Sequence, residues 1–192
     1  MRIKFNSPVI LTFSLLSALI YFISEATGGT LMQNFMLGRV DLSDPSSLFT
    51  LVSHALGHVS IEHLLGNLTF ILLIGPIVEE KYGSRKTLIM IILTALITGI
   101  LNILIFNTGL IGASGIVFML ILLVSFTNSR NGEIPITFIL VALLFIGKEV
   151  LAALSADQVS QFAHIIGGVC GSIFGFTGRK KPGRMIQPDS IS

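Results

Sequence analysis

Four polar side chains stand in otherwise apolar stretches of this sequence, and together they could carry out nucleophilic catalysis. They are His63, Asn67, Ser114 and His164. A serine hydroxyl becomes a useful nucleophile only when a neighbouring base takes its proton, and histidine is the commonest such base. Imidazole and amide groups can also donate hydrogen bonds to an oxyanion that forms during acyl transfer. The residue types therefore suggest a serine hydrolase whose site lies in apolar surroundings.

The composition identifies those surroundings as a lipid bilayer. Of the 192 residues, 52% are hydrophobic and 11% are charged, and the mean hydropathy is +0.88. Soluble domains carry roughly 25% charged residues, so a chain this apolar could not cover its core with polar surface. The length suits one helical bundle without a second domain. The single cysteine, Cys170, excludes an intrachain disulfide and a CxxC metal site.

Six apolar segments are candidates for membrane helices, which need about 20 mostly apolar residues each. They cover residues 8–24, 61–78, 88–106, 114–127, 134–154 and 162–176. The fourth segment is short and would extend only about 21 Å at 1.5 Å per residue. Because it follows the Gly-rich stretch 109–113, it would begin below the membrane surface, next to protein or a water-filled cavity. We therefore predict an all-α membrane protein, a six-helix bundle with a site inside the membrane.

The basic residues predict that both ends of this bundle face the cytoplasm (N-in, C-in). Lysine and arginine favour cytoplasmic loops, and with the N-terminus inside, all of the 12 basic residues except Arg39 and Lys148 would be cytoplasmic. This topology gives a membrane domain at residues 1–178 and a basic cytoplasmic tail at 179–192. The first outer loop, about residues 25–60, is apolar enough to fold back onto the membrane or the bundle. A cleaved signal peptide would also explain the first segment, but no A-x-A-type cleavage site follows it.

Small residues surround Ser114 at the start of the fourth segment. It lies in the sequence Gly-Ala-Ser-Gly, between Gly112 and Gly115. Small neighbours let a substrate backbone approach closely, and the free N–H groups of a helix N-terminus suit a developing oxyanion. The alternative interpretation is that Ser114 is an N-cap residue without a catalytic role.

Glycines also surround His164 in the sixth segment. Gly167, Gly168 and Gly171 follow three, four and seven residues later and share its helical face. Gly167 and Gly171 form a G-x-x-x-G pattern, which permits close helix packing. The face could bring His164 within hydrogen-bond reach of a neighbouring helix. The alternative is a histidine that bonds a backbone carbonyl between helices.

His63 and Asn67 lie four residues apart, so they share one face of the second segment. Both side chains can donate hydrogen bonds, and together with the Ser114 N–H they could bind an oxyanion. A polar contact between helices is the simpler alternative. Metal binding by His54, His58 and His63 is disfavoured because Glu62 adjoins His63 and does not stand between paired ligands, as it would in H-E-x-x-H. We expect neither a metal nor a cofactor.

The order of these motifs resembles the rhomboid family of intramembrane serine proteases. The matching stretches are residues 53–58 (SHALGH), 63–67 (HLLGN), 78–83 (VEEKYG), 112–115 (GASG) and 163–168 (AHIIGG). Each stretch is weak evidence alone, but the ordered set, within residues 48–176, is specific. The resemblance implies that Ser114 and His164 form a catalytic dyad. It also implies that His63 and Asn67 bind the oxyanion.

The resemblance carries further expectations about the fold and the partners. It implies a six-helix fold with the dyad in a water-filled cavity, a membrane-embedded first loop, and a substrate gate at residues 134–154. The expected partners are transmembrane protein substrates and the lipid bilayer, without nucleic acid. The expected location is a prokaryotic plasma membrane, with the site opening to the non-cytoplasmic side. The oligomeric state stays open.

Two features of the sequence depart from the family pattern. The family often has a Trp-Arg pair in the first loop, and this chain has no Trp, so the loop must be anchored differently. A Tyr commonly stands four residues after the nucleophile, whereas here the residue is Phe118. Its ring can still pack on the base, but it has no hydroxyl.

Two other functions are compatible with a polar membrane bundle. A rhomboid-like pseudoprotease would bind membrane proteins without cutting them, although the retained Ser114 and His164 argue against it. A small transporter would need a polar midplane site, and the sequence shows no inverted repeat. No third carboxylate is placed beside His164 by the sequence, since Glu149 and Asp157 lie at unassigned positions. A dyad is therefore the simpler expectation.

Overall fold

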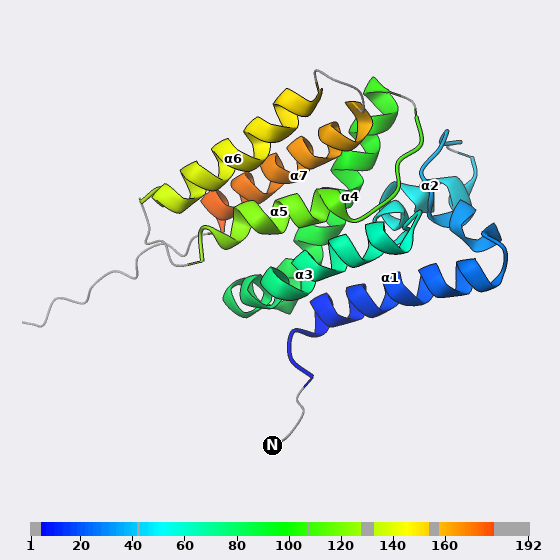
Figure 1. Cartoon of the computed structure of the whole chain (residues 1–192), viewed down its shortest axis with the longest axis horizontal. Helices are drawn as coiled ribbons and strands as arrows, with labels where there is room; N and C mark the ends of the chain where they lie inside the picture. The colour runs from blue at the N-terminus through cyan, green and yellow to red at the C-terminus, as the bar shows by residue number, and fades with distance from the viewer. Residues whose placement is uncertain (1–4, 42, 107, 128–132, 154–157, 179–192) are drawn as a thin grey trace, which may run out of the picture.

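The computed structural model describes residues 5–41, 43–106, 108–127, 133–153 and 158–178 as an all-helical bundle (Figure 1). The α-helices in these ranges are α1 (Pro8–Ala26), α2 (Pro45–Ser53), α3 (Ile61–Tyr82), α4 (Ser84–Ile105), α5 (Ser114–Val124), α6 (Ile136–Ala153) and α7 (Gln158–Thr177). Two 3-10 helices, η1 (Thr30–Phe35) and η2 (His54–Leu56), lie between α1 and α3. Arg2, Lys4, Arg130, Asp157 and the expected tail at 179–192 lie outside the described residues, as do the side chains of Lys148 and Glu149.

All six expected segments are helices, but some boundaries were predicted wrongly. Helix α3 continues beyond residue 78, and α4 begins before residue 88, because polar residues extend both helices past their apolar parts. The break between them is Gly83, whose φ of 83° lies in the left-handed region that favours glycine. Helix α5 ends before residue 127 because the amides of Phe126 and Thr127 bond to carbonyls three residues back (3.1 and 3.0 Å). These bonds form the tighter turns that often close a helix.

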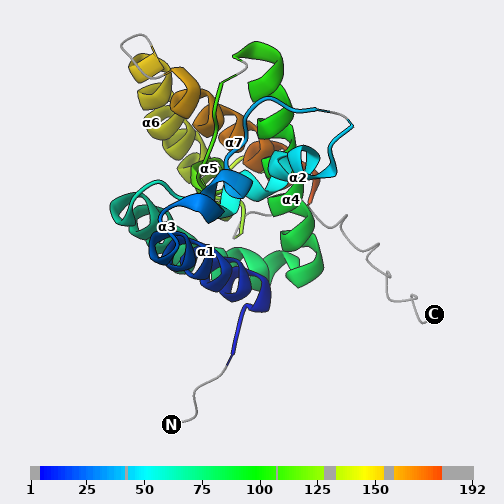
Figure 2. The same cartoon turned by 90° about the vertical axis from the view of Figure 1, so that its right-hand side faces the viewer.

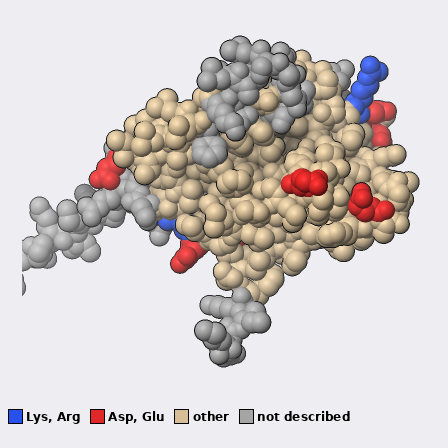
Figure 3. Space-filling model, in the orientation of Figure 1, with Lys and Arg blue, Asp and Glu red and all other residues tan. Residues whose placement is uncertain are grey.

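Three of the helices, α1, α3 and α4, are long and apolar enough to cross a membrane. The apolar helix α5 and the apolar part of α7 within the described residues are shorter. In the space-filling view most of the described surface is uncharged, and the few charged side chains stand apart from one another (Figure 3). Large exposed apolar side chains on α1, α3 and α4 agree with contact with lipid tails.

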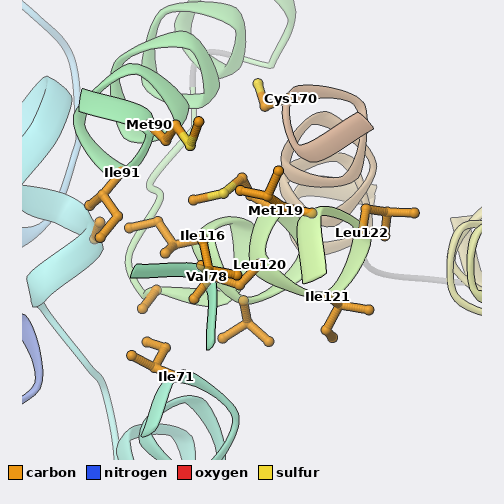
Figure 4. Close-up of a cluster of buried hydrophobic side chains, with 14 of the residues drawn as sticks. Ile71, Val78, Met90, Ile91, Ile116, Met119, Leu120, Ile121, Leu122 and Cys170 are labelled. Atoms are coloured by element: carbon orange, nitrogen blue, oxygen red, sulfur yellow. The ribbon is translucent and has the colours of Figure 1, made fainter. Parts of the chain in front are cut away.

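Helix α5 occupies the centre of the bundle, where every residue from Gly115 to Leu123 is buried. Its side chains meet a ring of residues from the surrounding helices (Figure 4), among them Ile71 and Val78 of α3, Met90 and Ile91 of α4, and Cys170 of α7. In a membrane, lipid tails are as apolar as these side chains, so packing rather than the hydrophobic effect holds the helices together. The position of α5 therefore depends on how closely its neighbours fit.

The closest neighbour of α5 is α7, and glycine makes the approach possible. A Cβ atom on Gly167 would overlap the carbonyl of Gly115, and one on Gly171 would overlap the carbonyl of Met119. One turn further along α7, a Cβ on Gly175 would overlap the ring of Phe126. The two helices thus touch backbone to backbone, as G-x-x-x-G patterns permit.

A buried carboxylate joins α3 to the start of α1. Glu79 is only 3% exposed, and its two oxygens accept hydrogen bonds from the amides of Val9 (3.1 Å) and Ile10 (3.0 Å). These amides are among the unpaired N–H groups of a helix N-terminus, where negative charge is also favourable. At the same end of the bundle, the ring of Tyr82 lies against the backbone of Gly178. The start of α1 and the ends of α3 and α7 therefore lie together.

The connection between α1 and α3 is folded against the bundle. Its helix α2 begins at the N-cap Asp44, which accepts from the Ser46 amide (3.0 Å), and it lies against α4 (Figure 2). The contact is close, since a Cβ on Gly99 would stand 2.7 Å from the Leu51 carbonyl oxygen. Leu37, which is fully buried, exchanges two backbone hydrogen bonds with Leu110 (2.9 and 3.0 Å). The loop is thereby joined to the segment that leads into α5.

Replacing Gly171 with alanine should destabilise the protein, whereas the same change at Gly66 should not. The new Cβ at position 171 would overlap the Met119 backbone, and overpacking costs about 1–3 kcal/mol. At Gly66 nothing lies within 4 Å of an added Cβ, and alanine is the better helix former by about 1 kcal/mol. Thermal unfolding of both variants in one detergent measures the difference. Equal Tm values would contradict the close contact between α5 and α7.

Candidate active site

Ser114 is the first residue of α5 and is partly exposed. The N-cap position belongs to Ala113, and no side chain there bonds to the helix. Ser114 thus follows the N-cap position that the simpler interpretation gave it. Its location at the helix start leaves its own N–H among those that have no partner within the helix.

His164 lies on α7 and meets α5 through an aromatic contact. Its ring stacks on that of Phe118 with centroids 4.3 Å apart and planes at 6°. Phe118 stands one helical turn after Ser114, so the two residues share a face of α5. Next to this contact, a Cβ on Gly115 would lie 3.2 Å from the Ala163 carbonyl oxygen. The first turn of α5 and the turn of α7 that carries His164 are therefore in direct contact.

The other two glycines of the α7 face differ in what they do. Gly167 is at the close approach to Gly115, as described above, and it fixes how near His164 comes to the start of α5. Gly168 is buried, and its carbonyl accepts a hydrogen bond from the Ser172 hydroxyl (2.8 Å). This hydrogen bond of Gly168 lies within α7 itself.

His63 lies on α3 and faces the segment that precedes Ser114. A Cβ on Gly112 would stand 2.5 Å from Cε1 and 2.7 Å from Nε2 of the His63 ring. Gly112 also has a φ of 120°, which L side chains rarely adopt. The start of α3 is set by Ser60, whose hydroxyl accepts from the His63 amide (3.2 Å) in the manner of an N-cap. Glycine at position 112 thus lets the His63 ring lie directly against the backbone two residues before Ser114.

Asn67, one turn further along α3, is held by His58, for which the sequence predicted no role in the site. The Nδ2 atom of Asn67 donates to Nε2 of His58 (3.0 Å). The other ring nitrogen of His58, Nδ1, lies 3.2 Å from the Leu56 carbonyl oxygen. Because a carbonyl can only accept, Nδ1 carries the proton and Nε2 is free to accept from Asn67. One N–H of the Asn67 amide is therefore occupied and the second is left for another acceptor.

The ring of His58 also packs edge-on against His63, with centroids 5.0 Å apart. One histidine therefore contacts both of the expected oxyanion-binding side chains. No spacing rule relates residue 58 to residues 63 and 67, since they lie on either side of the start of α3. Only the SHALGH resemblance singles out His58 in the sequence.

His54 joins the loop before α3 to α4 and to the segment before Ser114. Its Nε2 donates to the Ala95 carbonyl of α4 (3.1 Å), and its own carbonyl accepts from the Gly112 amide (2.9 Å). The ring nitrogens of His54 and His58 thus have different hydrogen-bond partners. Within the part of the chain that the structure describes, no group of three His, Cys, Asp or Glu residues could hold a metal ion.

Comparison with known proteins decides the family. The family model of the Rhomboid domain matches residues 45–181, which is well over half of the chain. The chain belongs to the rhomboid family. It is therefore an integral membrane protein, and the resemblance noted from its motifs is confirmed.

Individual relatives of this rhomboid agree with the domain match. It is 28% identical over 138 residues to the Rhomboid protease GlpG of Haemophilus influenzae, an alignment that covers 70% of this chain and 72% of the relative. It is 26% identical over 183 residues to the protein of the same name from Yersinia pestis, covering 94% of this chain and 66% of the relative. The rhomboid thus spans about two thirds of the length of the Yersinia relative.

The stability of this site should fall on acidification. His54 and His58 lie in the connection before α3, and burial lowers the pKa of each from 6.5 to about 4. Between pH 6.5 and pH 4 these two histidines bind protons in the unfolded chain but not in the folded chain. The free energy of unfolding therefore decreases as the pH falls from 6.5 to 4. The loss should reach about 3 kcal/mol per histidine at most. Below pH 4 the decrease should level off.

Denaturant unfolding in detergent across this pH window measures the effect. The variant His58→Gln should be less stable at neutral pH, because its contact with Asn67 is disturbed. It should also show a shallower pH dependence, because one titrating group is gone. A free energy of unfolding that does not change between pH 6.5 and 4 would contradict the burial of the two rings.

Proposed function

We propose that this rhomboid is a serine endopeptidase that hydrolyses peptide bonds in or near transmembrane segments of membrane proteins. The observation that carries the proposal is the stacking of His164 on Phe118, one helical turn from Ser114. This contact holds the imidazole on the face of α5 that bears the serine hydroxyl. The relatives named as rhomboid proteases give further support.

In the proposed reaction, Ser114 and His164 act as nucleophile and base. His164 takes the hydroxyl proton as the Ser114 oxygen attacks the scissile carbonyl carbon, whose oxygen becomes negative. The tetrahedral intermediate then loses its C–N bond, and His164 gives the proton to the leaving amine. A water molecule hydrolyses the resulting ester by the same transfers and regenerates the serine.

Three donors are suited to the oxyanion in the proposed reaction. They are its own amide at the start of α5, the His63 ring beside Gly112, and the second N–H of Asn67. His58 accepts the first N–H of Asn67 and fixes the orientation of the amide. Removing one such donor in other hydrolases costs about 10²–10³ in kcat. The His58–Asn67 bond is therefore a positioning contact within the proposed site.

We further propose that six helices cross the membrane, with both chain ends in the cytoplasm. Lys81, Arg85 and Lys86 lie at the junction of α3 and α4, next to the start of α1 that Glu79 binds. Arg39 lies at the opposite end, in the loop that pairs with Leu110. The basic residues among those described are thus distributed as the positive-inside rule expects, which supports a site at Ser114 that opens to the non-cytoplasmic side.

The proposed substrates reach Ser114 from the lipid between α3 and α6. Helix α6 contacts α5 and α7, whereas no described residue of α6 contacts α3. The exposed residues Ile139, Leu140 and Leu143 give α6 an apolar surface, as a path for transmembrane segments needs. Residues 134–154, which contain α6, correspond to the gate that the family resemblance implies.

The dyad is tested with purified full-length protein in detergent and a model transmembrane substrate. Ser114→Ala and His164→Ala should each reduce cleavage by about 10⁴-fold or more, as loss of such residues does in other serine proteases. The matched control is Ser172→Ala on α7, whose hydroxyl bonds only to its own helix, and it should cleave like the wild type. Cleavage by folded Ser114→Ala would refute the nucleophile. Silence of the wild type on several substrates would favour the pseudoprotease.

The choice of substrate should depend on how easily its helix unwinds. An intact transmembrane helix has all its amides bonded internally, so a scissile bond becomes accessible only after local opening. Segments with Gly or Pro near the outer end should be cut faster than those without, because both residues weaken a helix by about 1–3 kcal/mol. Cleavage rates of paired substrates that differ at one such position measure this. Equal rates for a poly-Leu segment would rule the idea out.

A further inference from the structure

An apolar groove lies away from the proposed site, between α1 and α4, with α2 and η2 across one end. Its volume is about 420 Å³. Side chains from three helices line it, among them Phe13 and Leu16 of α1, Phe49 and Val52 of α2, and Leu88 and Ile92 of α4. Of its lining residues, all of them described, only Thr12 and Ser53 are polar, and the Ser53 hydroxyl donates to the Asn34 carbonyl (3.3 Å). The groove therefore suits hydrocarbon.

The length of the groove restricts what can fill it. On α1 the lining runs from Pro8 to Leu16, and on α4 from Leu88 to Ala95. Each stretch covers about 10–12 Å at 1.5 Å per residue, which is less than half of the roughly 30 Å hydrocarbon core. Beyond this length, α2 and η2 close the groove. A transmembrane helix would need contact along its whole length, whereas a lipid tail from one leaflet would fit.

The charges at the open end favour an anionic headgroup. Arg85 lies one turn before Leu88 on the same side of α4 as the groove, and it is exposed. No ion pair of Arg85 with another described residue exists, and the nearby carboxylate of Glu79 is occupied by the α1 amides. Glu80 is exposed in the adjoining depression beside Ser84. Lys86 follows about 100° further round the helix, away from the groove.

We propose that this groove binds one acyl chain of an anionic phospholipid from the cytoplasmic leaflet, with the headgroup beside Arg85. The inference rests on the inside orientation proposed above for the start of α1. The bound chain fills the space beneath α2, and it supports the loop that pairs with the segment before Ser114. Anionic lipids are typical of the cytoplasmic leaflet, and each basic residue near the surface strengthens their binding.

The test uses tryptophan fluorescence, because the chain has no Trp of its own. Phe13→Trp places a reporter in the groove, and Leu15→Trp places a matched one at the same depth on the lipid-facing side of α1, where Leu15 is 62% exposed. Each full-length variant is reconstituted in phosphatidylcholine vesicles with about 20% phosphatidylglycerol as the anionic lipid. Bromine atoms on the acyl chains of one lipid or the other then quench whichever Trp they reach.

At equal mole fraction, brominated phosphatidylglycerol should bind near the Phe13→Trp reporter about fivefold better than brominated phosphatidylcholine, the effect expected of one basic residue. The Leu15→Trp reporter should show no preference. Arg85→Gln should remove the preference at the groove, and Lys86→Gln, which changes the same charge on the other side of α4, should keep it. If Phe13→Trp does not fold, Leu16→Trp serves as the groove reporter.

Several results would overturn the proposal. An unquenched groove reporter would show that lipid does not enter. Equal quenching by both lipids would reduce the groove to ordinary bilayer contact, and a preference that survives Arg85→Gln would place the headgroup elsewhere. Relief of quenching by a transmembrane substrate peptide would make the groove a substrate contact instead. Since the readout is fluorescence, the lipid site and the proposed peptidase activity can fail independently of each other.

Discussion

The backbone contact between α5 and α7 is the constraint on which the rest of the structure depends. Gly167 and Gly171 let α7 approach Gly115 and Met119 more closely than any side chain would allow. That distance sets the position of His164 relative to the first turn of α5, and the Phe118 ring then fixes the imidazole plane. In a membrane no hydrophobic effect drives helices together, so close packing must hold them. The geometry of the candidate dyad therefore depends on these glycines as well as on Ser114 and His164.

The opposite side of the site depends on contacts of α3 with the loop segments that precede α3 and α5. Gly112 leaves room for the His63 ring, and His58 orients both His63 and Asn67. These contacts join the end of the first loop, the start of α3 and the approach to α5. The site thus combines one half, in which α5 and α7 carry the proposed nucleophile and base, with another half, in which α3 and the start of α5 carry the proposed oxyanion donors.

The sequence predicts the positions of the long helices well and the contacts made by loop residues poorly. Apolar runs locate all six long helices, because hydropathy reports burial in lipid, and the G-x-x-x-G spacing indicates the close α7 contact. Helix α2 was not predicted, although Asp44-Pro45 is a good start signal. The His58–Asn67 bond and the positive φ of Gly112 follow no periodicity. They arise from tertiary contacts of the loop residues His58 and Gly112 with α3, which a single sequence does not reveal.

The two hydrogen bonds between Leu37 and Leu110 have a mechanical consequence. They hold the loop between α1 and α2 against the extended segment that leads into α5, and the bond from the Gly112 amide to the His54 carbonyl adds a second point of attachment. A force on the loop, such as that exerted by a bilayer of different thickness, is transmitted through these bonds to the backbone just ahead of Ser114. Movement of the loop would therefore shift the backbone next to the proposed nucleophile.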